Sequence, residues 1–212
     1  MSVPDAAACL ASLPKHKKYQ CILADAPWQY NNTSNNGTAA KHYKTMSTAD
    51  LEALPIKDLS DKTCLLFMWV TCPLIPDALR VIEAWGFSYK SVFKCWTKRC
   101  KNGSPAFGVG WYSRPSVELM FVATKGSGVT SLKTTNSERQ EFASVPGKHS
   151  EKPEEIRLQV RDFLNVPNRL ELFARSTCPG FDSWGLELPG YFVEDSKEAL
   201  QAGQSSTVTP KP

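Results

Sequence analysis

The chain has 212 residues, of which 42% are hydrophobic and 22% charged, and its formal net charge is +4. This length suits one domain with a substantial core, and the composition excludes a chain that is disordered over most of its length. The mild positive charge permits nucleic-acid binding without demonstrating it.

Membrane and metal functions are not expected. No apolar run is long enough to span a bilayer, and the N-terminus lacks the pattern of a signal peptide. The seven cysteines are scattered, odd in number and without a Cys-x-x-Cys pair, which predicts reduced thiols and a cytoplasmic or nuclear compartment. Cys95 and Cys100 have no histidine nearby, so we expect no metal site there.

Hydrophobic periodicity, helix caps and turn residues predict the elements in chain order. A helix capped by Ser47 is expected because Asp50 follows three residues later. The other expected elements are a buried strand over Tyr19–Ala26, a loop over 31–44, a strand over Thr63–Thr71, a helix over Pro76–Trp85 ended by Gly86, strands over Phe87–Lys98 and Val117–Thr124, a loop over 126–147 with a short strand near Gln140–Val145, a helix opened by Pro153 and a strand over Asn168–Arg175.

Strands that alternate with helices predict a three-layer α/β domain with a mostly parallel sheet. In such sheets, ligands gather at the carboxyl ends of the strands, which is where Asp25 and Arg175 are expected. The expected organisation is an N-terminal segment over residues 1–18, a folded domain over 19–194 and a disordered tail over 195–212.

The string Asp25-Ala26-Pro27-Trp28, directly after a buried strand, carries the chemistry. The exocyclic amine of adenine is a poor nucleophile, and two acceptors aimed at its two N–H bonds favour the pyramidal form that can attack a methyl sulfonium. The Asp25 carboxylate is one such acceptor and the Ala26 carbonyl the other, aimed by the fixed turn at Pro27. Trp28 offers a flat face on which a flipped base can stack. The alternative is an ordinary turn, because Asp and Pro are common turn residues.

These residues resemble the Asp-Pro-Pro-Trp signature of the family typified by the messenger-RNA adenosine N6-methyltransferase catalytic subunit, which also contains phage, viral and bacterial DNA adenine methyltransferases. Further segments of the chain are similar to that family in the same order. They are His42–Ser47, Leu66–Thr71, Phe107–Arg114 leading to Glu118 and Lys125-Gly126, His149–Pro153 and Leu170–Arg175.

The resemblance implies a permuted Rossmann-like methyltransferase fold that uses S-adenosylmethionine, with the catalytic motif before the cofactor strand and the methyltransferase domain over residues 19–194. It implies that Asp25, Ala26, Pro27 and Trp28 form the catalytic turn. The implied cofactor residues are Asp25, Lys152, Glu171, Arg175, Thr177 and Glu187, and the implied substrate residues are Trp28, Tyr43, Glu118, Lys152, Trp111 and Arg114.

The sequence departs from the family pattern at three places. Ala26 replaces the usual first proline, and because its carbonyl is the working group we expect activity to survive. Leu186 stands where an Asn is common, which predicts one fewer hydrogen bond to the ribose. An acidic residue that precedes the catalytic strand in some relatives has only Asp5 as a candidate match.

Other candidate residues have plainer interpretations. Trp69, Trp85 and Trp96 fall in strand or helix patterns that favour the core. Trp111 and Tyr112 lie in a Gly-flanked loop, and for them a role in substrate binding and a role in an interface are both left open. The cluster Lys98, Arg99 and Lys101 is interpreted as a solvated loop, with phosphate contact as the alternative.

Three functions compete. The leading hypothesis is a catalytic adenine-N6 methyltransferase that acts on nucleic acid, with DNA favoured over RNA because Gly108–Arg114 resembles phage and bacterial members. The alternatives are an RNA adenosine methyltransferase and a catalytically silent nucleic-acid-binding subunit, although Asp25 and Trp28 are both retained. An unrelated nucleotide-binding protein would need a phosphate loop that the sequence lacks. Whether the chain forms a homodimer or heterodimer is left open.

Overall fold

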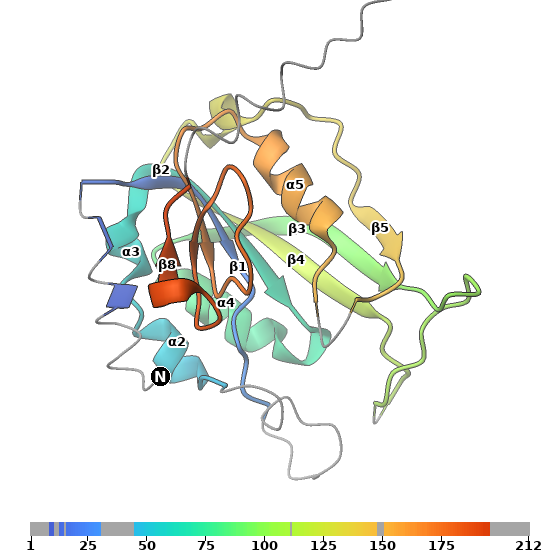
Figure 1. The fold of residues 1–212 in the computed structure, drawn as a ribbon. Coiled ribbons are helices and arrows are strands. Elements are labelled where there is room, and N and C mark those ends of the chain that lie inside the picture. The colour runs from blue at the N-terminus through green and yellow to red at the C-terminus, as the bar shows by residue number, and fades with distance from the viewer. Residues whose placement is uncertain are drawn as a thin grey trace, which may run out of the picture.

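One eight-stranded mixed sheet organises the chain in the computed structural model, with strand order β5-β3-β4-β2-β1-β6-β7-β8 (Figure 1). The structure describes residues 9–10, 13–14, 16–30, 45–110, 112–147 and 151–195. The strands are β1 Tyr19–Ala24, β2 Ser60–Val70, β3 Ser88–Lys98, β4 Val117–Lys125, β5 Glu141–Ser144, β6 Arg169–Leu172, β7 Asp182–Trp184 and β8 Phe192–Val193.

The centre of the sheet is parallel, and both flanks contain antiparallel pairs. β1 lies between β2 and β6 and runs parallel to both, and β7 continues parallel to β6. β4 is antiparallel to β2 and to β3, and β8 is antiparallel to β7. The prediction of a mostly parallel sheet is therefore wrong on the β3–β4 side, because those two strands follow one another in the chain without a crossover helix between them.

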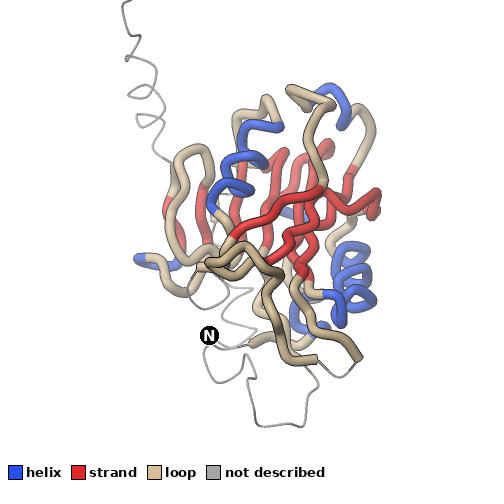
Figure 2. Tube along the Cα trace, turned by 90° about the vertical axis from the view of Figure 1, so that its right-hand side faces the viewer, coloured by secondary structure: helices blue, strands red, loops and turns tan. Residues whose placement is uncertain are grey.

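Two hydrophobic clusters lie on the two faces of this sheet, because successive side chains of a strand point to opposite faces. Ile22 and Met68 contribute to the cluster that includes side chains from the helices α2, Thr48–Glu52, and α4, Ile75–Ala84. Leu23 and Phe67, one residue along each strand, contribute to the cluster that includes α5, Glu154–Phe163. Figure 2 shows the strands, in red, lying side by side, with the helical segments, in blue, around them. The remaining short elements are α3 Ile56–Leu59, η2 Cys72–Leu74, η3 Val129–Leu132 and η4 Pro189–Tyr191.

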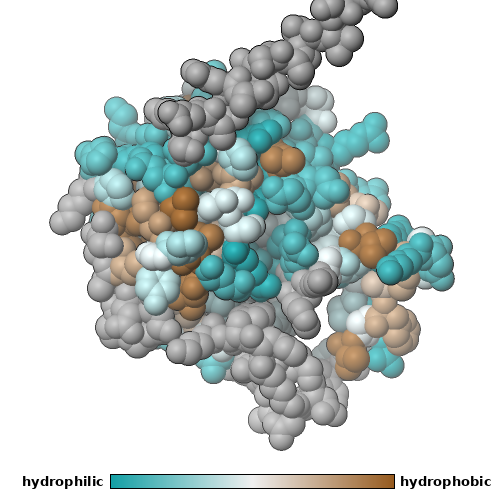
Figure 3. Space-filling view, viewed as in Figure 1, coloured by the Kyte–Doolittle hydropathy of each residue, from teal (hydrophilic) through white to brown (hydrophobic). Residues whose placement is uncertain are grey.

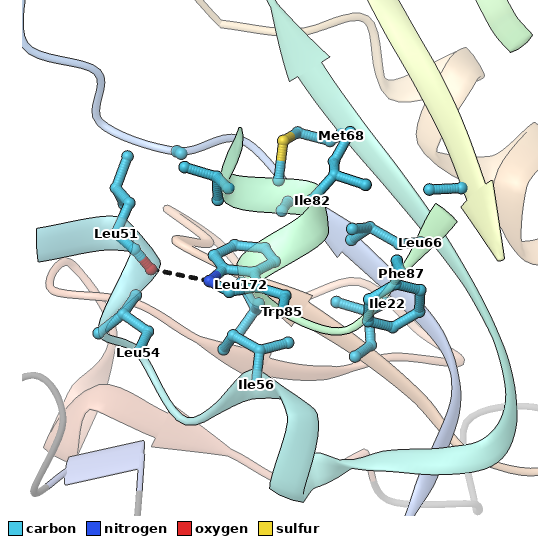
Figure 4. Packing of buried hydrophobic residues seen from close by; sticks show 14 of the residues in the cluster. Ile22, Leu51, Leu54, Ile56, Leu66, Met68, Ile82, Trp85, Phe87 and Leu172 are labelled. Carbon is cyan, nitrogen blue, oxygen red and sulfur yellow. Dashed lines mark hydrogen bonds between the residues drawn. The ribbon is translucent and has the colours of Figure 1, made fainter. Parts of the chain in front are cut away.

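Trp85 is a core residue, as its helical spacing predicts. Its side chain is fully buried and its Nε1 donates a 2.7 Å hydrogen bond to the Leu51 carbonyl (Figure 4). Ser47 caps α2 with a complete capping box, in which the Asp50 side chain accepts a hydrogen bond from the Ser47 backbone N–H and the Ser47 hydroxyl accepts one from the Asp50 backbone N–H. Gly86 adopts φ +81° after α4, a left-handed conformation that suits glycine and ends the helix.

Two features of the sequence-based assignment need correction near the C-terminus. β6 ends at Leu172 rather than at Arg175, because Phe173 adopts φ +63° and turns the backbone away from the sheet. The short strands β7 and β8 were not predicted, since each is too short to show a period of alternating side chains.

At the N-terminus, Leu10 and Leu13 lie within the segment expected before the domain, and both are buried in the core.

Within the part of the chain that the structure describes, no helix is long and apolar enough to cross a membrane. No disulfide joins any of the seven cysteines, and the Cys9 sulfur accepts a hydrogen bond from Trp184. Among the same described residues, no group of three or more His, Cys, Asp or Glu is placed to hold a metal ion. The expected loop over 31–44, most of the expected tail and Asp5 lie outside the described residues.

Candidate active site

The strand directions bring three charged residues to one edge of the sheet. Asp25 follows β1 at its carboxyl end. Glu118 begins the antiparallel strand β4, which places it beside the carboxyl end of β2, where Val70 pairs with Leu119. β3 ends at Lys98, two residues after Trp96, which is the partner of Glu118 in the β3–β4 register. The topology therefore collects side chains that lie up to 93 positions apart (118 minus 25) in the sequence.

Lys152 links these residues into a network of four charges, which comprises Asp25, Lys152, Glu118 and Lys98. Its Nζ lies 2.9 Å from Asp25 Oδ2 and 3.3 Å from Glu118 Oε2. Lys98 Nζ donates to the other Glu118 oxygen, Oε1. Two ammonium groups thus alternate with two carboxylates, and each charge faces an opposite one.

Glu118 and Lys152 stay ionised within the four-charge network although both side chains are largely buried. Burial alone raises the pKa of Glu118, but Lys152 and Lys98 outweigh burial and lower that pKa below its ordinary value. Burial likewise acts to lower the pKa of Lys152, and Asp25 and Glu118 reverse the direction and raise it. A pair of this kind is costly to break, because removal of one partner leaves a buried charge uncompensated.

Two tryptophan rings pack against the two lysines of the four-charge network. Lys152 Nζ lies 5.7 Å from the Trp69 ring centroid, and Lys98 Nζ lies 4.9 Å from that of Trp96. Both rings are buried on the face of the sheet that α5 covers, and they meet edge to face at 6.1 Å. The sequence-based assignment of Trp69 and Trp96 to the core is confirmed, and the structure adds cation–π contacts with the two lysines.

The turn after β1 is fixed by backbone hydrogen bonds to Met46. Met46 N donates to the Pro27 carbonyl at 2.8 Å, and Gln29 N donates to the Met46 carbonyl at 3.1 Å. The Ala26 carbonyl accepts from Trp28 N at 2.9 Å, which leaves one of its two lone-pair directions for another donor. The turn is therefore a rigid acceptor site next to a carboxylate.

Trp28 is less accessible than a base-stacking role suggests. Its ring is 6% exposed, and its Nε1 donates a 3.2 Å hydrogen bond to the Trp69 carbonyl. Stacking of a base on this ring therefore requires a neighbouring segment to move. Tyr30, two residues on, contacts Thr71 at the end of β2 through a 2.6 Å hydroxyl pair.

A second buried carboxylate lies one strand away, at Glu171 on β6. Glu171 pairs with Leu23, so the Glu171 side chain lies on the face of the sheet that α5 covers. There Arg157 of α5 contacts the Glu171 carboxylate. Arg157 Nε and NH2 lie 2.8 and 2.7 Å from Glu171 Oε2, and NH2 also donates to the Ser176 carbonyl. Arg157 was not singled out from the sequence, because it is one of several cations in the predicted helix and the helical pattern does not distinguish it from solvent-exposed ones.

Glu171 is held differently from Glu118. Burial raises its pKa to about 7, and the single cation Arg157 only partly opposes that effect. Its second oxygen, Oε1, is not part of the Arg157 contact. A carboxylate in this setting is suited to accept hydrogen bonds from hydroxyl groups of a ligand.

The segment after β6 folds back against β7. A Cβ at Gly185 would lie 1.9 Å from the Ala174 carbonyl oxygen, so only glycine permits this close approach. Arg175 Nε lies 3.7 Å from Glu187 Oε1, which brings two predicted cofactor residues together. Thr177 and Leu186 are exposed on the same segment.

The structure thus gathers most predicted site residues and leaves some apart. Asp25, Glu118 and Lys152 contact one another, and Glu171 lies on the strand beside Asp25. Arg114 lies instead on the long β3–β4 connection, with its guanidinium 4.7 Å from the Phe107 ring centroid. Tyr43 and Trp111 lie outside the described residues. Lys98 belongs to the site, and its interpretation as part of a solvated loop is wrong.

The chain is similar in sequence to known proteins over most of its length. A family model described as MT-A70 matches residues 19–187. The chain is 32% identical to the Type II methyltransferase M.MunI of Mycoplasma sp, over 86% of this chain and 82% of the relative. It is 27% identical to the N6-methyladenosine RNA methyltransferase MTA1 of Pyricularia oryzae, over 88% of this chain and 51% of the relative. It is also 27% identical to the DNA N6-methyl methyltransferase of Caenorhabditis elegans, over 80% of this chain and 45% of the relative.

The chain therefore spans about half the length of the last two relatives and most of the first. The match to the family model begins at the first residue of β1 and ends at Glu187, so it includes every strand that borders the candidate site. The chain belongs to the MT-A70 family.

Proposed function

We propose that this protein transfers a methyl group from S-adenosylmethionine to the N6 amine of adenine in nucleic acid, with DNA favoured over RNA. The observation that carries the proposal is the Asp25 carboxylate, fixed by Lys152 at 2.9 Å beside a carbonyl with a spare lone pair. The fold that goes with this activity is a permuted, three-layer Rossmann-like domain over residues 19–194, with the catalytic β1 before the cofactor strand β6.

The residues at the sheet edge suit S-adenosylmethionine. Glu171 provides a buried carboxylate for the ribose hydroxyls, and the close Gly185–Ala174 approach makes a tight wall beside it. Lys152 provides a cation for the cofactor carboxylate or for the adenosine, and Arg175, Thr177 and Glu187 line the same side. The sequence has no glycine-rich phosphate loop, and this cofactor has no phosphates. When bound, it supplies an electrophilic methyl sulfonium.

The catalytic turn orients the amine. Asp25 and the Ala26 carbonyl accept hydrogen bonds from the two N6–H groups, so the nitrogen becomes pyramidal and its lone pair is withdrawn from conjugation with the ring. The Asp25 charge also stabilises the positive charge that develops on N6 during transfer. No strong base is needed, because the cationic N6 that results from methyl transfer is acidic enough to lose its proton to water.

Lys152 fixes the position of Asp25. An ammonium 2.9 Å from the carboxylate orients it, which fits a role in holding the amine and in charge stabilisation. Glu118 and Lys98 fix Lys152 in turn, so the four-charge network is pre-organised before the substrate arrives. The adenine must leave a duplex stack to reach this turn.

The polymer is proposed from resemblance rather than from the site. The relatives named above include one called an RNA and one called a DNA methyltransferase. The Gly108–Arg114 segment, similar to phage and bacterial members, favours DNA. A catalytically silent subunit is disfavoured because Asp25 and its whole four-charge network are in place.

The test is methyl transfer from labelled S-adenosylmethionine to DNA and RNA oligonucleotides, single-stranded and duplex, followed by digestion and mass spectrometry. We expect N6-methyladenine with the wild type and with Asp58→Ala, the same change at an exposed aspartate on α3. We expect none above background with Asp25→Ala. Equal activity of Asp25→Ala and wild type would overturn the proposed role of the turn.

A further inference from the structure

The long connection between β3 and β4 projects from the body of the protein and carries exposed apolar side chains. The described residues of this connection, 99–110 and 112–116, are here called the arm, which extends to the right of the sheet in Figure 1. Phe107 is 75% exposed, Val109 is 93% exposed and Tyr112 is fully exposed. Figure 3 shows brown and teal side chains close together on this projection. Contiguous exposed apolar groups of this kind mark binding surfaces.

The arm is folded, so its exposed side chains are displayed by a defined backbone. Lys98 N donates to the Ser116 carbonyl at 2.7 Å, and Ala106 N donates back to the Lys98 carbonyl at 2.9 Å. Further out, Gly108 N donates to the Pro115 carbonyl at 3.2 Å. A Cβ at Gly108 would lie 2.4 Å from that carbonyl oxygen and one at Gly110 2.3 Å from the Ser113 carbonyl oxygen. The two glycines are therefore needed for the hairpin to close.

The charge of the arm points to an anionic partner. It contains the cations Arg99, Lys101 and Arg114 and no acidic residue. Arg114 stacks on Phe107 with its guanidinium 4.7 Å from the ring centroid. Stacking fixes the plane of a guanidinium while its N–H donors remain at the edge, where they suit a phosphate. Exposed aromatic rings between cations are the combination that binds bases and backbone of a nucleic-acid strand together.

The arm is also continuous with the candidate active site. Its first residue follows Lys98, which holds Glu118 in the four-charge network. Arg99 N donates to the Ser144 carbonyl at 2.8 Å, and Ser144 Oγ accepts from Trp96, whose ring lies under Lys98. A nucleic-acid strand whose adenine enters the catalytic turn would therefore extend toward the arm, which is rigidly joined to that turn.

We infer that the arm binds the nucleic-acid strand beside the target adenine, with Phe107 and Tyr112 stacking on neighbouring bases and Arg99, Lys101 and Arg114 contacting phosphates. This inference rests on the proposed function and adds the element that grips the substrate outside the target base. Stacking requires open base faces, so the arm favours single-stranded or locally opened DNA over intact duplex.

The test is binding of the full chain to fluorescein-labelled single-stranded DNA, measured by anisotropy over a series of salt concentrations. In Lys101→Ala/Arg114→Ala, we expect the slope of log affinity against log salt to become shallower by about 0.7 for each lost phosphate contact. In Tyr112→Ala, we expect roughly tenfold weaker binding at an unchanged slope, with Tyr112→Phe close to wild type. Lys90→Ala, at the exposed far end of β3, serves as the matched cation control and keeps the wild-type slope.

Unchanged affinity and slope in both arm variants would overturn the inference. So would a loss of self-association, seen by sedimentation, with DNA binding intact, because the arm would then be a contact between protein copies. The proposed function is judged separately, by wild-type methyl transfer to the same oligonucleotide. If the wild type methylates the oligonucleotide and the arm variants bind it as the wild type does, only the inference about the arm is rejected. If the wild type binds the DNA but does not methylate it, the proposed methyltransferase function is rejected.

Discussion

Glu118 and Glu171 are two buried carboxylates on the α5 face of one sheet, and their surroundings act on them in opposite directions. Glu118 faces two lysines, which lower its pKa against the effect of burial. Glu171 faces one arginine, and burial raises its pKa to about 7. The difference lies in the number of cations that face each carboxylate. It separates the proposed substrate side, where lysines lower the pKa of Glu118, from the proposed cofactor side, where the pKa of Glu171 lies near neutrality.

The largest effect is expected at Asp25, which joins the substrate side to the reacting atoms. In Asp25→Asn, the shape of the turn is kept but the charge that stabilises developing positive charge on N6 is lost. We expect the rate of methyl transfer at saturating substrates to fall roughly a hundredfold to a thousandfold. Single-turnover kinetics measure this loss, and a fall confined to the KM for DNA would contradict a role in the transition state.

Removal of Lys152 breaks the four-charge network at its centre. In Lys152→Met, Asp25 and Glu118 lose their shared cation, and we expect the free energy of unfolding to fall by about 3 kcal/mol. The pKa of Glu118 then rises, so the stability that its ionised form contributes, present above its unfolded pKa, is lost at a higher pH than in the wild type. Chemical denaturation across pH measures both effects. Lys90→Met is the matched control, expected within about 0.5 kcal/mol of wild type.

The cofactor side is expected to respond to pH. Because its pKa is raised from 4.5 to about 7, Glu171 carries a proton below that pH and a charge above it. An ionised carboxylate accepts hydrogen bonds from ribose hydroxyls better than a protonated one does. The affinity for S-adenosylhomocysteine should therefore fall as pH falls through about 7, by up to roughly tenfold per pH unit. Isothermal titration calorimetry measures the profile. A wild-type profile as flat as that of Glu171→Gln would show that this carboxyl does not titrate there.

Lys98 should matter less than Lys152, because Glu118 keeps one cation when it is removed. In Lys98→Met, we expect about 1.5 kcal/mol of lost stability, at the lower end of the range for a hydrogen bond to a charged group. Denaturation of Lys98→Met beside Lys152→Met measures the difference. Equal losses would contradict the view that Lys152 is the shared centre of the four-charge network.

Much of this arrangement is readable from the sequence, and the remainder depends on contacts between distant segments. The catalytic turn was predicted because Asp25-Ala26-Pro27-Trp28 follows a buried run directly, whereas the hydrogen bonds with Met46 that fix the turn are not readable from local order. Helix α2 was predicted from the Ser47 capping box. Lys98 and Arg157 were missed because their roles arise only when β3 meets β4 and when α5 covers β6. The sheet's antiparallel flank was missed because apolar runs do not reveal strand direction.

The most direct test of the central claim uses two oligonucleotides that differ in one group. One contains a single adenine, and the other has that adenine replaced by purine, which lacks the exocyclic amine. With labelled S-adenosylmethionine and wild-type protein, we expect label on the first oligonucleotide alone, recovered as N6-methyladenine. Equal label on both oligonucleotides, or label recovered on another base, would contradict methyl transfer to N6 at the Asp25 turn.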